Sequence, residues 1–441
     1  MPLNHTDSNV SGELDTSIYH LVDRLFPICR SITGNGVRKT LAVIKEYIPV
    51  EIHEVPSGTQ VFDWKVPREW NIRDAYIKDS SGKRILDFRE NNLHVVSYSV
   101  PVHRKLPLQE LKTHLHTLPE HPDWVPYRTS YYNEDWGFCL SQNQLSSMRD
   151  GEYEVMIDAS LEDGHLSYGE FVLPGETEEE ILLTTHICHP SLANDNLSGI
   201  AVLTHLARYL QRVQRRHTYR FLFIPGTIGS ITWLALNEQK RSGIKCGLVV
   251  ACVGDGGGPT YKCSRHGDAP VDLAARHVLQ HCGGEPRVLD FSPYGYDERQ
   301  FCSPGINLPM GLFERSKYGE FPEYHTSADN LDFVTPEHLL ESFHMIRQIL
   351  EILERNRRYV NRYPMCEPQL GKRGLYDAIG GDKDRARRQM ALLWVLNQSD
   401  GSHSLLDIAE RADLPFEMID HAASLLEDKG LVELCPDSMP D

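Results

Sequence analysis

The chain has 441 residues, of which 40% are hydrophobic and 24% are charged, a composition typical of globular proteins with more than one domain. Its 45 Lys and Arg residues are outnumbered by 62 Asp and Glu residues, so the formal net charge is −17. A chain this acidic is repelled by phosphate backbones, which argues against nucleic acid as the main partner. No stretch approaches the roughly 18 apolar residues that a membrane-spanning helix needs, so no membrane association is expected.

The beginning of the chain and its cysteines both bear on the cellular compartment. The opening stretch, MPLNHTDSNVSGELDTS, is polar and acidic and lacks the basic and apolar regions of a secretory signal. The ten cysteines are scattered and form no C-x-x-C pair. We therefore expect reduced thiols, mostly buried, in a cytoplasmic protein.

The first third of the chain changes character near residue 55. Residues 17–50 carry a helical pattern that is broken by Pro27 and by a TGNG turn. Short alternating runs such as NLHVVSYSV and YEVMIDASL follow between about residues 55 and 170. They predict a β-rich segment. This segment also holds four of the six tryptophans, which suggests a small core of its own: Trp64, Trp70, Trp124 and Trp136.

From residue 178 onward, apolar strands alternate with amphipathic helices. The strands read EEILLTTH, YRFLFIP, GLVVACVGD and NLPMGLF, and the helices include SGIAVLTHLARYLQRV and TPEHLLESFHMIRQILEILERNRR. Continuous apolar strands between such helices predict an α/β fold with a mostly parallel, doubly wound sheet. We assign residues 1–54 and 171–360 to this α/β domain and residues 55–170 to an inserted β-rich domain.

The C-terminal region reads as a linker followed by a small helical domain. Residues 361–386 are rich in Pro, Gly and charge, and residues 387–441 show the helix–helix–helix–strand pattern of a winged helix. The expected recognition helix spans residues 415–429 and carries one lysine against four acidic residues: Glu417, Asp420, Glu427 and Asp428. DNA docking requires the opposite charge, so packing or homo-oligomerisation is the expected role.

The candidate metal ligands are two histidines and a carboxylate at strand ends. In open α/β sheets, ligands bind beyond the carboxyl ends of the strands. His186 ends the strand ILLTTH, Asp195 lies on the next loop, and His325 follows the NLPMGLF strand and a short loop. Two histidines and one carboxylate with an open position make a hydrolytic zinc site, in which Asp329 would orient the ring of His325. The alternative is that these are ordinary polar residues at strand ends.

Three further features of the sequence are expected to be structural. His189 precedes Pro190 and is expected to serve the turn, while Cys188 is expected to pack inward. The stretch GDGGGP at 254–259 lacks the lysine and the following helix of a phosphate-binding loop, so a tight turn is expected.

The motif YGYDERQF supplies the candidate catalytic residues. It places Asp297, Glu298 and Arg299 side by side. A carboxylate near a metal can act as general base on water, and the arginine can hold a substrate carboxylate. The motif could equally be a solvated, charged loop.

The order of these motifs resembles that of the zinc aminopeptidases with a phosphorylase/hydrolase-like α/β fold. The stretches LFPICRSITGNGVRKTL, VPREWNIRDAYI, HICHPSLANDNLSG, FIPGTIGSI, YDERQFCSPGINLP and EYHTSADNLDF resemble, more closely, a bacterial family of aminopeptidase-like proteins. That family is labelled as a domain of unknown function and occurs among polysaccharide or natural-product biosynthesis proteins. The resemblance covers residues 17 to 436. It implies a zinc exopeptidase-like domain with an inserted β domain and a C-terminal winged helix.

The aminopeptidase pattern carries over only in part. The resemblance places its first metal histidine on His186, its bridging aspartate on Asp195 and its last histidine on His325. The aspartate that normally follows two residues after the first histidine is here Cys188. Its adjacent glutamates, the general base and a ligand, fall by counting on Phe223 and Ile224, with Gly226 nearby, and its further aspartate ligand falls on Ala251.

The missing carboxylates lead to a specific expectation about function. We expect a zinc-dependent, aminopeptidase-like hydrolase with one zinc per chain, acting on a peptide or another small molecule that contains an amide. Glu298 is the expected replacement base. The alternatives are a metal-dependent deacylase or amidase acting on a sugar or secondary-metabolite intermediate, and a catalytically inactive, zinc-stabilised binding protein.

Overall fold

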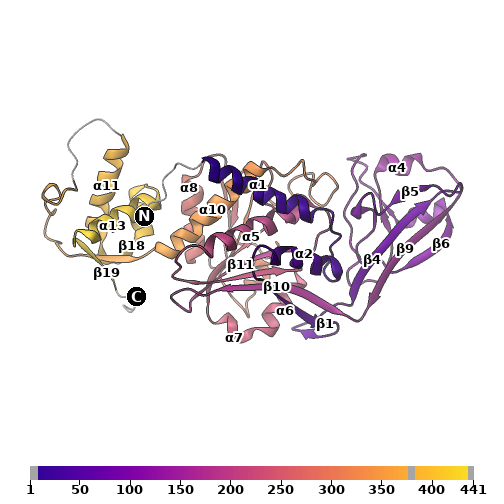
Figure 1. Ribbon diagram of the computed structural model, residues 1–441, viewed down its shortest axis with the longest axis horizontal. Coiled ribbons are helices and arrows are strands. Elements are labelled where there is room, and N and C mark those ends of the chain that lie inside the picture. Colours follow the sequence, from indigo (N-terminus) through magenta and orange to yellow (C-terminus); the bar gives the residue numbers. More distant parts are fainter. Residues whose placement is uncertain (1–7, 376–382, 436–441) are drawn as a thin grey trace. The chain divides into compact units, whose positions relative to one another are not determined.

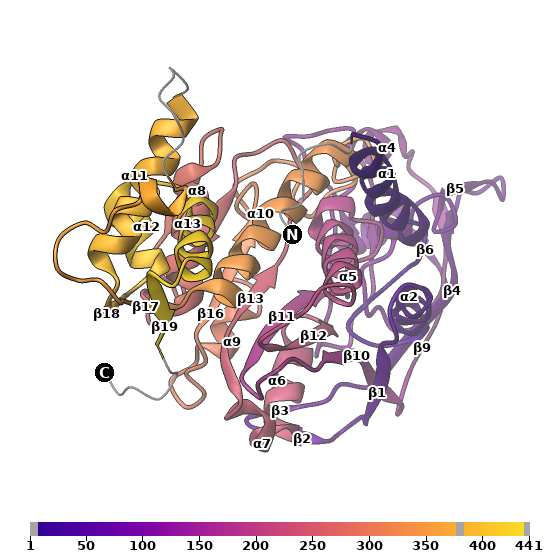
Figure 2. The ribbon, with the colours of Figure 1, turned by 60° about the vertical axis from the view of Figure 1, so that its left-hand side comes forward.

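The computed structural model describes residues 8–375 and 383–435 (Figures 1 and 2). Parts of the expected N-terminal, linker and winged-helix segments, residues 1–7, 376–382 and 436–441, lie outside the described residues. The chain divides into two compact units, and the second consists of residues 270–286 and the chain from residue 345 onward. No helix among the described residues is long and apolar enough to cross a membrane.

The first unit is built on a mixed sheet of eight strands, which confirms the predicted α/β class. Its four central strands, β12, β11, β13 and β16, run parallel, and the strand next to them on each side, β10 or β14, is antiparallel. In spatial order the strands are β1 (Glu51–Pro56), β10 (His165–Leu173), β12 (Thr218–Ile224), β11 (Glu180–His186), β13 (Ile244–Val250), β16 (Met310–Glu314), β14 (Thr260–Lys262) and β15 (Arg287–Leu289). The parallel strands are almost wholly buried, as their continuous apolar sequences predict.

Helices cover both faces of this sheet. Figure 1 shows α1 (Ser8–Leu25) and α5 (Gly199–Leu210) on one face, and α6 (Ile228–Leu236) and α7 (Glu238–Arg241) on the other. Helix α2 (Asn35–Lys45) contacts β10, and α5 contacts β11. The helical pattern expected over residues 17–50 is therefore confirmed, and it belongs to the α/β layer.

The first residue of α5 must be a glycine. A Cβ atom at Gly199 would lie 2.7 Å from both Thr185 Oγ1 and the carbonyl oxygen of Val250. Such contacts are far too short for a side chain, so glycine alone allows this helix to begin directly against the ends of β11 and β13. This close packing brings the loop that precedes α5 to the carboxyl edge of the sheet.

The inserted segment forms its own sheet but shares the core of the first unit. Its four strands are β5 (Arg84–Asp87), β4 (Glu69–Lys78), β9 (Glu152–Glu162) and β6 (Val102–Pro107), in that spatial order, and two short pairs are β2 (Gln60–Val61) with β3 (Trp64–Lys65) and β7 (Leu115–His116) with β8 (Phe138–Cys139). One continuous cluster of buried side chains contains Trp70 and Phe138 together with Leu222 from the main sheet. The expectation of a separate small core was therefore wrong, and Trp64 is in fact 47% exposed.

The second unit contains the winged helix. Its antiparallel sheet has β17 (Arg358–Asn361) between β18 (Asp400–Ser404) and β19 (Val432–Leu434), and its helices are α11 (Lys383–Gln398), α12 (Leu405–Ala412) and α13 (Phe416–Asp428). Strand β17 places the beginning of this fold before residue 387. Helix α8 (Pro270–His281) belongs to the same unit, where His277 Nε2 accepts a 2.9 Å hydrogen bond from the Phe416 amide.

Candidate metal centre

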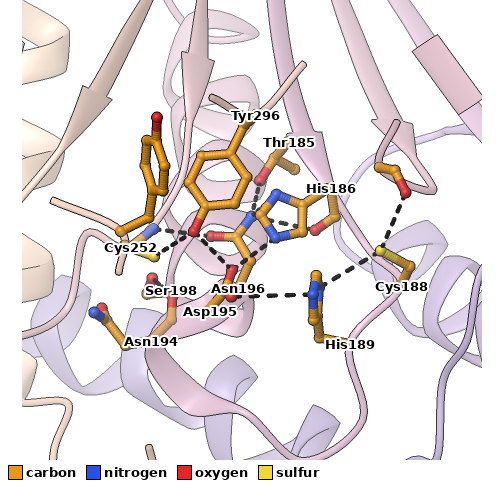
Figure 3. Close-up of polar contacts among 12 residues, drawn as sticks. Thr185, His186, Cys188, His189, Asn194, Asp195, Asn196, Ser198, Cys252 and Tyr296 are labelled. Atoms are coloured by element: carbon orange, nitrogen blue, oxygen red, sulfur yellow. Dashed lines mark hydrogen bonds and ion pairs between the residues drawn. The ribbon is translucent and has the colours of Figure 1, made fainter. Parts of the chain in front are cut away.

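Three histidines surround the carboxylate of Asp195 at the carboxyl end of β11. His186 Nε2 lies 2.8 Å from Asp195 Oδ1, and His325 Nε2 lies 3.0 Å from Asp195 Oδ2. The structure thus brings together the three ligands expected from the sequence. His189 Nε2 lies 4.0 Å from Asp195 Oδ2, and one ligand atom each from His186, His189 and Asp195 fall within 4.8 Å of one another. Figure 3 shows these three side chains facing the same point.

Two atoms of this cluster have no hydrogen-bond partner. Asp195 Oδ2 and His325 Nε2 are both buried and unpartnered, although they lie only 3.0 Å apart. A carboxylate oxygen and an imidazole nitrogen that approach so closely without hydrogen-bond geometry can be satisfied by a shared cation. The residues of the centre therefore fit a metal ion.

The electrostatic environment gives the ligands suitable protonation states. Burial alone would raise the pKa of the Asp195 carboxyl, but the surrounding histidines outweigh it and hold this pKa well below its usual range. Burial lowers the pKa of His189 to about 3. An ionised carboxylate and a neutral imidazole are the forms that bind metals, because a protonated ligand must first release its proton.

The loop that carries Asp195 is fixed to neighbouring strand ends by two asparagines. Asn196 Nδ2 donates to Thr185 Oγ1 over 2.7 Å, and Asn196 Oδ1 accepts from the Cys252 amide over 3.1 Å. Asn194 Nδ2 donates to Asp255 Oδ2 over 2.8 Å. Asp255 also accepts from the Gly257 amide, which closes the tight turn expected at residues 254–259.

Asp329 orients the backbone at Asp195, and the expectation that it orients the His325 ring was wrong. Asp329 Oδ1 accepts from the Asn194 amide over 2.5 Å, and Asp329 Oδ2 accepts from the Asp195 amide over 2.9 Å. Both carboxylate oxygens are thus used by the ligand loop. Burial raises the pKa of Asp329 to about 8. A single short motif therefore supplies one candidate ligand, His325, and the support for another, Asp195.

Replacing Asp329 by alanine is expected to lower the free energy of unfolding by about 2–4 kcal/mol, because two buried amides lose their acceptor. The metal affinity should also fall by roughly 10- to 100-fold, as is typical when the support of a ligand is removed. Chemical denaturation and zinc titration measure the two effects. The control is Asp332→Ala, three residues away and exposed, which should change neither quantity. Unchanged metal affinity in Asp329→Ala would remove its positioning role.

His189 is the member of the centre that the sequence interpretation missed. We expected it to serve the turn, yet the structure places its ring beside those of His186 and His325, with centroid distances of 4.9 and 5.1 Å. The turn is held by a residue from another segment: Arg30 Nε donates to the His189 carbonyl oxygen over 2.8 Å. The i, i+3 spacing of the two histidines was a usable signal, which the following Pro190 obscured.

Two buried thiols lie beside the centre. Cys188 Sγ lies 3.5 Å from His189 Nδ1, and Cys252 Sγ lies 3.1 Å from the hydroxyl of Tyr296. Burial raises the pKa of Cys188 to about 12 and that of Cys252 well above its usual range. Cys188 thus packs inward, as expected. Ala251 is buried, and the next residue, Cys252, contacts Tyr296, which in turn donates to Asp195.

The region where the resemblance places a glutamate pair holds a glycine. Phe223 and Ile224 are fully buried in β12, whereas Gly226 lies on the loop beyond the strand. A Cβ atom at Gly226 would lie 3.1 Å from His186 Cβ and 3.6 Å from Asp297 Oδ2. The counted positions therefore lie in the strand, and the residue beside the centre has no side chain.

Of the three candidate catalytic residues, Asp297 lies against this glycine. Asp297 is fully buried, and its Oδ1 accepts a 2.8 Å hydrogen bond from Ser230 Oγ. Its Oδ2 has no partner. Burial raises the pKa of Asp297 to about 6, although His186 opposes that shift. One carboxylate oxygen is thus anchored while the other faces the space that Gly226 leaves.

The side chains of Glu298 and Arg299 contact Lys262 and Tyr294, respectively. Glu298 Oε1 pairs with Lys262 Nζ over 2.7 Å, and Lys262 also donates to the Tyr294 carbonyl oxygen over 2.8 Å. Glu314 is buried nearby, where burial raises its pKa to about 8 and the Glu298 charge adds to that shift. The guanidinium of Arg299 lies 5.7 Å from the ring of Tyr294.

Tyrosines line the rest of the centre. Tyr296 stacks on His186 and donates to Asp195 Oδ1 over 3.2 Å, and Tyr324 stacks on His325 with ring centroids 4.0 Å apart. Tyr127, from the inserted segment, presents its ring to both His189 and His325. The Tyr127 amide donates to the His325 carbonyl oxygen over 2.8 Å. The insertion thus contributes directly to the wall of the centre.

Comparisons with known proteins agree with this architecture. A family model described as a domain of unknown function (DUF4910) matches residues 19–356, and one described as a winged helix-turn-helix matches residues 357–434. A Clostridium acetobutylicum protein is 56% identical over 424 residues, covering 96% of this chain and 98% of that protein. Its name proposes a polysaccharide biosynthesis protein with an aminopeptidase-like domain.

Solved structures extend the comparison. The structure of a protein proposed to be a peptidase, also from Clostridium acetobutylicum, has a TM-score of 0.92 at 54% identity and covers 96% of this chain and 97% of that chain. A zinc aminopeptidase from Bacillus subtilis has a TM-score of 0.56 at 13% identity, covering 78% of this chain and 94% of that chain. A peptidase M28 precursor from Shewanella amazonensis gives 0.52 at 12% identity, covering 78% and 96%. The last two similarities show the fold alone.

Proposed function

Because the chain belongs to the family described as a domain of unknown function (DUF4910), we propose that it is an aminopeptidase-like, zinc-dependent hydrolase that cleaves an amide bond next to a free terminus. One zinc per chain is held at the centre around Asp195. The observation that carries this proposal is the pair of unpartnered atoms, Asp195 Oδ2 and His325 Nε2, in a cluster with His186 and His189. The aminopeptidase-like name of the 56% identical relative supports the reaction class.

The residues around the centre have different roles in the proposed hydrolysis. A zinc ion bound there supplies Lewis acidity, which polarises a carbonyl group and favours ionisation of water. Asp195 and histidines of the centre would hold the ion, and Tyr296 and Tyr127 cover part of the site. The Tyr296 hydroxyl keeps its proton, since burial raises its pKa well above the usual range. It can therefore donate a hydrogen bond.

We assign the general base to Asp297 in preference to Glu298. The carboxylate of Glu298 is held by Lys262, whereas Asp297 Oδ2 is unpartnered beside Gly226 and His186. A base on attacking water must lie within hydrogen-bond reach of it, directly or through one further water. Asp297 then takes the place of the glutamate that the resemblance implies, from a different loop. Binding of a substrate carboxylate by Arg299 stays a prediction.

A second reading of the same centre is deacylation of an amino sugar or related intermediate. The polysaccharide biosynthesis name of the relative favours it. A third alternative, a zinc-stabilised binding protein, follows from the absence of the glutamate pair, whose places hold Phe223 and Ile224. The three readings require the same metal but differ in turnover.

The test is a substrate panel with the zinc-loaded full chain. We expect release of amino acids from aminoacyl amides, loss of this activity on chelation and recovery on adding zinc. Turnover of acylated amino sugars alone would establish the deacylase instead. Chelation that lowers the unfolding temperature, with no turnover on any substrate, would establish the binding protein. Full activity after the protein has been freed of metal would contradict all three readings.

A further inference from the structure

We infer that His189 is a metal ligand in place of the missing carboxylates, so that the ion lies on the Oδ2 side of Asp195 with His189 and His325, while His186 positions Asp195 by a hydrogen bond. This inference rests on the proposed metal at this centre. It differs from the pattern implied by the aminopeptidase resemblance, in which His186 is a ligand. The argument follows from the two oxygens of Asp195.

Asp195 Oδ1 already has two hydrogen-bond donors. His186 Nε2 lies 2.8 Å from it with hydrogen-bond geometry, and the Tyr296 hydroxyl donates to it over 3.2 Å. The His186 ring is fixed in this orientation by stacking on Tyr296, with centroids 4.8 Å apart and an interplanar angle of 25°. A carboxylate oxygen with two donors at such distances is satisfied. Oδ1 is therefore not the oxygen that lacks a partner.

Asp195 Oδ2 is the oxygen left for the ion. It has no hydrogen-bond partner, and the imidazole nitrogens nearest to it belong to His325 at 3.0 Å and His189 at 4.0 Å. With zinc–ligand bonds of 2.0–2.2 Å and tetrahedral angles, two ligand atoms on one ion lie about 3.4 Å apart. The two measured separations bracket that value. Both close contacts have hydrogen-bond lengths, but only the 2.8 Å contact of His186 with Oδ1 also has hydrogen-bond geometry.

The backbone and the ring of His189 each have a fixed contact. Arg30, which is 1% exposed, donates from Nε to the His189 carbonyl oxygen over 2.8 Å. On the ring, Nδ1 faces Cys188 Sγ at 3.5 Å, which leaves Nε2 directed at Asp195. A ligating histidine typically uses one ring nitrogen for the metal and the other for an orienting contact. Here the orienting group is a thiol and the supporting arginine comes from the N-terminal segment.

The experiment compares cobalt and zinc binding in the full-length protein after its metal has been removed. Histidine is replaced by cysteine at one position at a time, because a thiolate ligand to cobalt(II) gives a charge-transfer band that imidazole does not. We expect this band in His189→Cys and its absence in His186→Cys. In addition, His189→Asn should lower zinc affinity by more than about 100-fold, and His186→Asn by roughly 10- to 100-fold, the range typical of supporting residues.

Controls separate the failure of this inference from the failure of the proposed function. His266→Asn replaces an exposed histidine outside the centre and should bind metal like the natural chain. Thermal unfolding of the metal-free variants shows whether each is folded. In the cysteine variants, ligation is seen as the appearance of the cobalt charge-transfer band, which misfolding would not produce. A band in His186→Cys but not in His189→Cys would overturn the inference and leave the zinc site intact. A natural chain that binds neither metal would overturn the proposed function as well.

Discussion

Replacing Asp297 by asparagine is expected to lower kcat on an aminoacyl amide by about 10²- to 10⁴-fold, the usual contribution of a general base. Asparagine keeps the size of the side chain and can still accept from Ser230, which now donates to Asp297 Oδ1 over 2.8 Å. What is lost is the carboxylate oxygen beside Gly226. Zinc content should remain that of the natural chain, because Asp297 is not a proposed ligand.

Glu298→Gln is the matched comparison, since it removes the neighbouring carboxylate from the same motif. Its Oε1 contact with Lys262 can be kept by the glutamine carbonyl, so kcat should remain within a few-fold of the natural value. Steady-state kinetics on zinc-loaded samples measures both variants. A large loss in Glu298→Gln together with full activity in Asp297→Asn would return the base to Glu298.

The different positions of these two neighbours show what the sequence alone could not resolve. Asp297 is the residue before the short helix α9 (Glu298–Phe301), and Glu298 is its first residue. Successive residues at the beginning of a helix point about 100° apart, so one can face the metal centre while the next faces Lys262. The motif predicted a carboxylate near the centre, and the structure places Asp297 beside Gly226 and His186. Choosing between adjacent carboxylates required the helix orientation, which the packing of α9 against α6 and β16 determines.

The fold was predictable where the pattern of burial is local. Parallel strands buried on both faces are continuous apolar runs, and β11, β12, β13 and β16 were each expected as such. The strands at one side of them were not: β1 and β10 lie at the borders of the inserted segment, where short alternating runs look alike whichever sheet they join. The shared core beneath the insertion also depends on contacts distant in sequence, such as those among Trp70, Phe138 and Leu222.

The part of the centre that could be predicted follows from the rule that ligands bind beyond the carboxyl ends of the strands. His186, Asp195 and His325 follow strands whose carboxyl ends meet at one edge of the sheet, so their convergence followed from strand order. The backbone at His189 is instead held by Arg30, which is 159 residues away in the sequence. The contact of Asp329 with the Asn194 and Asp195 amides is likewise tertiary, and spacing from His325 pointed to the wrong partner.

The buried ion pair beside the centre leads to the second large expected effect. Lys262 is 2% exposed and Glu298 is fully buried. Glu314, also fully buried, interacts electrostatically with both. Glu298 Oε2 and Glu314 Oε1 have no hydrogen-bond partner. Lys262 therefore provides the charge that makes burial of Glu298 tolerable, because an isolated carboxylate in the protein interior costs several kcal/mol.

Lys262→Met is accordingly expected to lower the free energy of unfolding of the first unit by about 3–5 kcal/mol, the range observed when one partner of a buried ion pair is removed. Lys262→Met/Glu298→Gln should recover most of this loss, since no buried charge is then left without its partner. Arg24→Met tests whether the loss of any ion pair has this effect. Arg24 and Glu46 pair on the surface, with side chains 42% and 56% exposed. The free energy of unfolding of this variant should therefore fall by less than about 1 kcal/mol. Denaturant-induced unfolding at neutral pH measures all three. A single variant as stable as the natural chain, or a double variant no more stable than the single, would show that Lys262 does not compensate the Glu298 charge.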